Sequence, residues 1–216
     1  MLRYKEISDF LEKMGEKMNI RKEKRELRNR IREKTAALSE QYKAEADRII
    51  TERLLLLPEY LKAERVFAFV GTENEINTKL FLEQVLADGK LLAVPLCVGK
   101  GIMEAKRIRS LSELKRGAYD ILEPEASAET VLLKEEDLAV IPCLSCDHKG
   151  NRLGHGAGFY DRYFQELRTR EVIICREALV EENIPMEETD HKFAKVLTEK
   201  GLYSESLKDS KKKDSN

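Results

Sequence analysis

The chain has 216 residues, a length that suits one sizeable α/β domain with its own core. Its 39 lysines and arginines nearly cancel its 40 aspartates and glutamates, and a net charge of −1 gives no overall field to attract nucleic acid or a membrane surface. The sequence has neither an apolar run long enough to cross a bilayer nor a secretory leader, so we expect a cytoplasmic protein without a membrane partner.

The first 34 residues predict two helical segments. Apolar side chains recur on one face of residues 1–18 until Asn19 and Ile20, where we expect an interruption, and residues 1–20 therefore form an N-terminal helical extension. Residues 21–34 form a strongly basic helix, whose interspersed glutamates are typical of a solvated face with ion pairs. Two other interpretations stay open: Lys24 and Arg28, one turn apart, reach an anionic ligand, or the segment binds nucleic acid. The glutamates and the lack of aromatic residues disfavour nucleic acid.

From residue 39 onward, helices and short apolar strands alternate. We predict helices at 40–57 and 78–87 and one beginning near Tyr160, and strands at 66–70, 91–96, 102–108, 138–142, 171–175 and 194–198. This alternation predicts an α/β fold, a three-layer, mostly parallel open sheet flanked by helices, which is Rossmann-like in architecture but lacks the dinucleotide fingerprint. We assign residues 21–203 to a single domain and residues 204–216, which are rich in serine and lysine, to a disordered tail.

Cys143 and Cys146 form a C-x-x-C pair, and His148 follows two residues later. Such a pair can bind a metal or take part in redox chemistry. The sequence has no second pair of cysteine or histidine residues at a suitable spacing, so a four-ligand zinc site cannot be completed locally. We therefore interpret these thiols as structural or incidental.

The most informative stretch is a loop with glycines at alternate positions, Gly154, Gly156 and Gly158. It lies between the predicted strand at 138–142 and the helix near Tyr160. A glycine-rich backbone between a strand and a helix favours phosphate binding through its free N–H groups, although a tight structural turn remains an alternative. This loop and residues 71–77 both follow strands of the predicted sheet, at the edge where α/β proteins bind ligands.

The residues from Arg152 to Arg162 resemble the signature of the 5-formyltetrahydrofolate cyclo-ligase family (methenyltetrahydrofolate synthetases), in which R-L-G-x-G-x-G-Y-Y-D is typical. The resemblance covers about residues 22–202. Further similar segments follow in the same order: Lys24 with Leu27-Arg28, residues 37–39, residues 75–78, Glu123-Pro124, Ile141-Pro142 with Asp147 and Gly150, Ile184-Pro185 with Asp190, and residues 196–199.

The resemblance implies a ligase that depends on ATP and Mg²⁺. In the family, the formyl oxygen of 5-formyltetrahydrofolate takes the γ-phosphoryl group of Mg-ATP, which releases ADP. A neighbouring folate nitrogen then attacks, phosphate leaves and 5,10-methenyltetrahydrofolate results. With a small folate as substrate, we expect a monomer or weak homodimer and no nucleic-acid partner.

The resemblance also implies a role for individual residues. ATP would bind to Lys24, Arg28, Arg152, Leu153, Gly154, His155, Gly156, Ala157, Gly158, Phe159 and Tyr160. The folate would contact Val70, Glu75, His155 and Phe159. Mg²⁺ would bind to Asp161 and Asp190, and the catalytic residues would be Arg152 and Lys24. Taken singly, each residue also has an ordinary interpretation, such as a surface charge or a turn residue.

The chain departs from the family pattern at five positions that bear on activity: Thr35, His155, Ala157, Leu179 and Thr189. Ala157 still offers its backbone N–H, so phosphate binding depends less on these departures than folate recognition does. An alternative is therefore a divergent paralogue that binds ATP but acts on another substrate or has only a binding or regulatory role.

Overall fold

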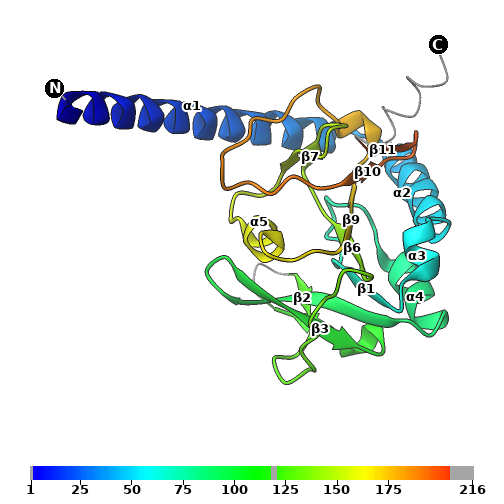
Figure 1. The fold of residues 1–216 in the computed structure, drawn as a ribbon. Coiled ribbons are helices and arrows are strands. Elements are labelled where there is room, and N and C mark those ends of the chain that lie inside the picture. The colour runs from blue at the N-terminus through cyan, green and yellow to red at the C-terminus, as the bar shows by residue number, and fades with distance from the viewer. Residues whose placement is uncertain (1, 118–120, 205–216) are drawn as a thin grey trace, which may run out of the picture.

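A seven-stranded sheet forms the centre of the molecule (Figure 1). The computed structural model describes residues 2–117 and 121–204, with side chains from Met14 onward. The strands of this sheet are β1 (Arg65–Ala68), β2 (Leu91–Gly99), β3 (Ile102–Ile108), β6 (Leu138–Ile141), β9 (Arg170–Ile174), β10 (Lys195–Leu197) and β11 (Leu202–Ser204). Their order is β11-β10-β9-β6-β1-β2-β3.

Neighbouring strands from β10 to β2 run parallel, and only the edge strands β3 and β11 are antiparallel. The predicted α/β class with a mostly parallel sheet is therefore confirmed. Two small antiparallel pairs lie outside this sheet: β4 (Lys115–Arg116) with β5 (Leu122–Glu123), and β7 (Ser145–Cys146) with β8 (Arg152–Leu153).

Five α-helices are described: α1 (Leu2–Ala37), α2 (Glu40–Leu55), α3 (Pro58–Lys62), α4 (Lys79–Ala87) and α5 (Phe159–Phe164). The predicted interruption at Asn19 and Ile20 is wrong, because neither residue breaks a helix and the Asn19 amide donates to Glu23 one turn further on. The domain boundary proposed at residue 20 thus falls inside one continuous helix. Pro58 does separate two helices, since it occupies the first turn of α3, where its missing N–H costs nothing.

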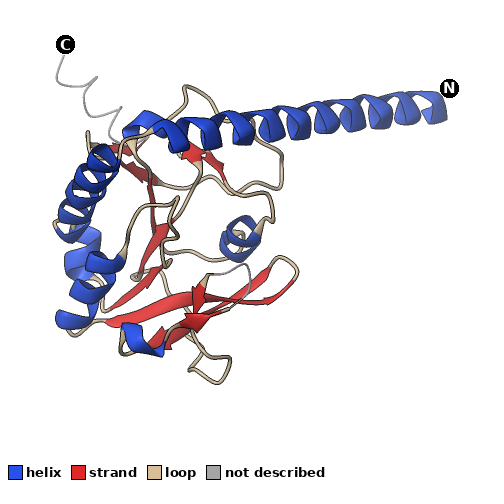
Figure 2. Cartoon of the chain, turned by 180° about the vertical axis from the view of Figure 1, so that it is seen from behind, coloured by secondary structure: helices blue, strands red, loops and turns tan. Residues whose placement is uncertain are grey.

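Each central strand is buried on both faces, which explains its uninterrupted apolar sequence. In β1, Val66 and Ala68 belong to a core cluster with side chains of α2, α3 and α4, whereas Phe67 belongs to a second cluster with side chains of α1 and α5. Figure 2 shows the α2–α4 layer on one side of the strands and α5 on the other. The α5 helix is shorter than its apolar spacing indicates, because Leu167 lies beyond its end at Phe164.

The long helix α1 is attached to the body by its C-terminal half, and its N-terminal half projects away (Figure 1). Leu27 and Ile31 are buried in the second core cluster.

No helix in the described part of the chain has the length and apolar character needed to cross a membrane. Of the predicted tail, Ser204 is instead the last residue of β11, and residues 205–216 lie outside the described residues.

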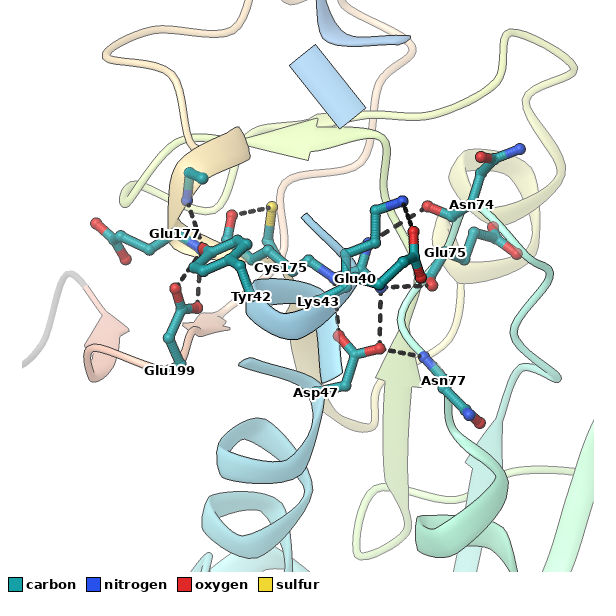
Figure 3. A network of polar contacts seen from close by, with 12 residues as sticks. Glu40, Tyr42, Lys43, Asp47, Asn74, Glu75, Asn77, Cys175, Glu177 and Glu199 are labelled. Atoms are coloured by element: carbon teal, nitrogen blue, oxygen red, sulfur yellow. Dashed lines mark hydrogen bonds and ion pairs between the residues drawn. The ribbon is translucent and has the colours of Figure 1, made fainter. Parts of the chain in front are cut away.

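A buried ion pair fixes the loop that follows β1. Arg176, two residues after the end of β9, donates to both carboxylate oxygens of Asp47 on α2, at 2.8 and 2.9 Å. Its guanidinium also donates to the backbone carbonyl of Glu75 at 2.8 Å, while Asp47 accepts from the backbone N–H of Asn77. Figure 3 shows Asp47 on its helix beside this loop. The pair therefore joins α2, the end of β9 and the Glu75 loop.

Replacing Asp47 should destabilise the fold, because Asp47→Ala leaves the Arg176 guanidinium buried without its charge partner. We expect a loss of about 3–5 kcal/mol in the free energy of unfolding, measured by urea denaturation. Glu52→Ala is the matched control, since it removes an exposed carboxylate that pairs with Arg48 on the same helix. Equal stability of the two variants would show that the buried pair does not anchor the loop.

Candidate active site

The glycine loop between β8 and α5 presents free backbone donors. Gly156 and Gly158 have φ values of 107° and 68°, which side chains other than glycine rarely adopt. The backbone N–H groups of residues 155–158 make no hydrogen bond within the described part of the chain. Because α5 is only six residues long, its dipole adds little, and the anion-binding capacity lies in the loop itself.

Arg152 lies beneath this loop and is only 7% exposed. Its guanidinium donates to the Pro142 carbonyl at 3.2 Å and to Asp161 Oδ2 at 3.0 Å, and it lies over the rings of Tyr160 and Phe193. Its Nε is buried and has no hydrogen-bond partner among the described residues. The site therefore holds one buried cationic donor that is available to a ligand.

The close approach of Arg152 to the loop requires a glycine at position 154. A Cβ atom there would lie 2.7 Å from one terminal nitrogen of Arg152, which is closer than such atoms can pack. The role of this glycine is thus to leave room for a guanidinium, whereas Gly156 and Gly158 are needed for their backbone angles.

Arg28 on α1 contacts the same loop from the other side, where its Nε donates to the Gly154 carbonyl at 2.9 Å. Burial lowers the pKa of Arg28, and so do the neighbouring guanidinium groups of Arg32 and Arg152. Asp190 and Asp161 act in the opposite direction. The two carboxylates implied as metal ligands thus lie within electrostatic reach of one arginine beside the loop.

Lys24, one turn before Arg28, is buried and forms an ion pair with Asp190. Its Nζ also lies 3.8 Å from Glu187. The pairing fixes the segment that carries Asp190 against α1. All the charged residues implied by the resemblance for phosphate and metal binding therefore gather between α1, the glycine loop and this segment.

A cavity of about 310 Å³ adjoins the loop. It is lined by Arg32, Thr35, Ala36, Asn74, Glu75, Ile76, Cys143, Leu144, His155, Cys175, Arg176 and Leu179. Glu75 and His155, both implied as folate contacts, lie here with Glu75 Oε1 and His155 Nε2 3.4 Å apart. His155 is also part of the glycine loop, so it stands between the loop and the cavity.

Glu75 is held as a carboxylate in this cavity. Burial opposes its ionisation, but hydrogen bonds from His155 and from the Thr72 N–H and hydroxyl outweigh that effect and lower the pKa of Glu75. An ionised carboxylate accepts hydrogen bonds only, so the cavity is suited to a ligand with an N–H edge.

Other residues implied by the resemblance lie near the cavity or loop without lining the cavity. Val70 packs against the first core cluster, and Phe159 and Tyr160 pack against the second. Leu153 is buried, so only its backbone faces the loop. Ala157 accepts a hydrogen bond from Arg162 through its carbonyl.

Of the departures from the family pattern, Thr35 and Leu179 line the cavity and Thr189 is exposed outside it. The Thr35 hydroxyl is bound to the Ile31 carbonyl of its own helix at 2.8 Å. The cavity wall therefore carries no charge at Thr35 or Leu179.

The sequence interpretation missed Arg176 and the position of Cys175. Arg176 directly follows the predicted strand at 171–175, which was the available signal, since a charged residue at the carboxyl end of a parallel strand points to the ligand edge. The juxtaposition of Cys175 with Cys143 and Cys146 had no local signal, because it arises from the pairing of β6 with β9.

Comparison with known proteins agrees with this geometry. The family model of the 5-formyltetrahydrofolate cyclo-ligases matches residues 20–199. The chain is 29% identical over 186 residues to the 5-formyltetrahydrofolate cyclo-ligase of Haemophilus influenzae, an alignment that covers 83% of this chain and 99% of that protein. It is 25% identical to the mouse enzyme of the same name, covering 84% and 96%.

A solved structure is similar as well. The 5,10-methenyltetrahydrofolate synthetase of Aquifex aeolicus superposes with a TM-score of 0.74 at 28% identity, covering 84% of this chain and 92% of that one. The match in sequence spans residues 20–199, and the match in structure covers 84% of this chain. The chain therefore belongs to the 5-formyltetrahydrofolate cyclo-ligase family, a family of ATP-dependent ligases of folate one-carbon metabolism.

Proposed function

We propose that the glycine loop holds the phosphates of ATP and that the adjoining cavity takes the pterin of 5-formyltetrahydrofolate. This proposal rests on the adjacency of two parts of the site. One is the set of free loop N–H groups, which Arg28 and Arg152 flank, and the other is the cavity around Glu75. His155 belongs to both parts. A phosphoryl transfer between two bound substrates requires such an arrangement.

The loop is suited to phosphate in three ways. Its N–H groups at residues 155–158 are unused within the described chain, Arg152 keeps one buried donor without a partner, and Lys24 and Arg28 add positive charge from α1. Transfer of a phosphoryl group spreads negative charge over its oxygens, and fixed donors stabilise that charge without rearrangement. Arg152 and Lys24 are the catalytic residues in this proposal.

The carboxylates of Asp161 and Asp190 fit a Mg²⁺ ion. Asp161 Oδ2 pairs with Arg152, and Asp190 Oδ2 pairs with Lys24 and accepts from the Glu187 N–H. The Oδ1 atom of each carboxylate makes no hydrogen bond within the described residues. Mg²⁺ in phosphoryl-transfer sites takes one or two carboxylates together with phosphate oxygens and water. When bound, the ion would neutralise part of the phosphate charge.

On the folate side, the Glu75 carboxylate would accept hydrogen bonds from the N–H edge of the pterin, with His155, Phe159 and Val70 beside it. The formyl oxygen attacks the γ-phosphorus of ATP and the bond to ADP breaks. The neighbouring folate nitrogen then bonds to the formyl carbon and gives up its proton to solvent, and the phosphate leaves with the former formyl oxygen. The ring so formed is that of 5,10-methenyltetrahydrofolate.

The ion pairs of the basic helix segment disfavour a nucleic-acid partner. Arg21 pairs with Glu187, and Arg30 and Lys34 both pair with Glu181. These charges are therefore partly neutralised by the body of the domain.

A cytoplasmic location is supported by the four free cysteines, since reducing compartments keep thiols unpaired. A monomer or weak homodimer stays a prediction.

Removing the Arg152 side chain should slow product formation. Arg152→Ala takes away the buried donor beneath the loop, and we expect kcat to fall about 10²–10³-fold, as when a positioned transition-state donor is lost. The measurement is the rise in near-ultraviolet absorbance of the methenyl product. Arg30→Ala, which removes an exposed arginine of α1 outside the site, should leave kcat unchanged. A kcat for Arg152→Ala close to that of the unaltered protein would contradict the role.

Neutralising Glu75 should weaken folate binding selectively. In Glu75→Gln the acceptor-only carboxylate becomes an amide, so we expect KM for 5-formyltetrahydrofolate to rise about tenfold or more while KM for ATP stays unchanged. Glu73→Gln, in the same loop but exposed, is the matched control and should alter neither constant. Equal effects on both KM values would place Glu75 outside the folate site.

A further inference from the structure

Three thiols come together in the cavity wall. Cys143 follows β6, Cys146 lies on β7 and Cys175 follows β9, and their sulfur atoms all lie within 4.8 Å of one another. Cys146 and Cys175 are 0% and 2% exposed. Among the described residues, no other group of three or more cysteine, histidine or acidic side chains is close enough to share a metal ion.

This spacing suits a single soft cation. Three thiolates that bind one Zn²⁺ at about 2.3 Å in tetrahedral geometry lie just under about 4 Å apart, so the sulfurs need only small shifts to reach it. Thiolates favour Zn²⁺ and other soft ions over Mg²⁺, which prefers oxygen ligands. The thiol cluster is thus chemically distinct from the carboxylates of Asp161 and Asp190.

The position of the cluster leaves one coordination site open. Cys143 and Cys175 line the cavity, whereas Cys146 lies behind them. The nearby His148 does not complete the set, because its ring stacks on Tyr203 and its Nε2 lies 3.3 Å from Glu177. A three-cysteine site would therefore present its fourth position to the cavity, as zinc sites with three protein ligands do.

We propose that Cys143, Cys146 and Cys175 together bind one Zn²⁺ ion in the wall of the cavity. Each thiol gives up its proton to solvent on binding, so the site carries three thiolates and a net charge of −1. This site goes beyond the phosphoryl-transfer reaction.

The test uses full-length protein that has been reduced and freed of metal by a chelator, without ATP or folate, so that its result is independent of the catalytic assignment. Zn²⁺ is titrated in competition with a chromophoric chelator. We expect one ion per chain and at least about a 100-fold loss of affinity in each of Cys143→Ser, Cys146→Ser and Cys175→Ser. Cys97→Ser, which removes the fourth cysteine outside the cluster, should bind as the unaltered protein does.

A second readout needs no variant. Bound Zn²⁺ should protect Cys143, the half-buried thiol of the cluster, from alkylation followed by mass spectrometry, and chelation should remove the protection, whereas the half-buried Cys97 should react equally with and without Zn²⁺. Unchanged affinity in the three single variants, or equal reactivity of Cys143 with and without Zn²⁺, would overturn the proposal. If the Zn²⁺ affinity depended on only two of the three cysteines, and mild oxidation removed two free thiols, those two cysteines would form a disulfide pair. That result would equally overturn the proposal.

Discussion

The parallel pairing of β9, β6 and β1 is the constraint on which the site depends. Val140 of β6 is in register with Ala68 of β1 on one side and with Val172 of β9 on the other. Because the three strands run in the same direction, the loops that follow them leave from one edge of the sheet. Glu75, the glycine loop and Arg176 meet there, although 101 residues separate Glu75 from Arg176 in the chain.

Buried positive charge at this edge is matched by carboxylates. Lys24 pairs with Asp190 and Arg152 pairs with Asp161, so neither cation is left buried without a partner, which would destabilise the fold. The result is a surface on which cationic and anionic groups alternate around the loop. We propose a magnesium nucleotide, which carries both phosphate oxygens and a divalent cation, as the ligand of this surface.

Much of the fold was accessible from the sequence because its signals are local. The uninterrupted apolar run at residues 66–70 predicted a buried strand, and glycines at positions 154, 156 and 158 predicted a loop between a strand and a helix. In the structure β1 overlaps that run, and Gly156 and Gly158 have positive φ values. The error at Asn19 and Ile20 arose because a change in composition was taken for a break in a helix that both residues tolerate.

The contacts that sequence reasoning missed are those made across the sheet. The Asp47–Arg176 pair joins residues 129 positions apart, and Cys175 reaches the C-x-x-C pair only through the register of β6 with β9. Resemblance to a family does not supply such contacts. The thiol cluster is one case. The cavity lining at Thr35 and Leu179, where the chain departs from the family pattern, is another.

The most direct test of the account is product formation by the purified protein. With Mg-ATP and 5-formyltetrahydrofolate together, the near-ultraviolet absorbance of 5,10-methenyltetrahydrofolate should rise, and omission of either ATP or Mg²⁺ should abolish the rise. Absence of product from the complete mixture, with ATP binding demonstrated by calorimetry on the same protein, would contradict the account. It would then identify the chain as a nucleotide-binding relative that acts on another substrate.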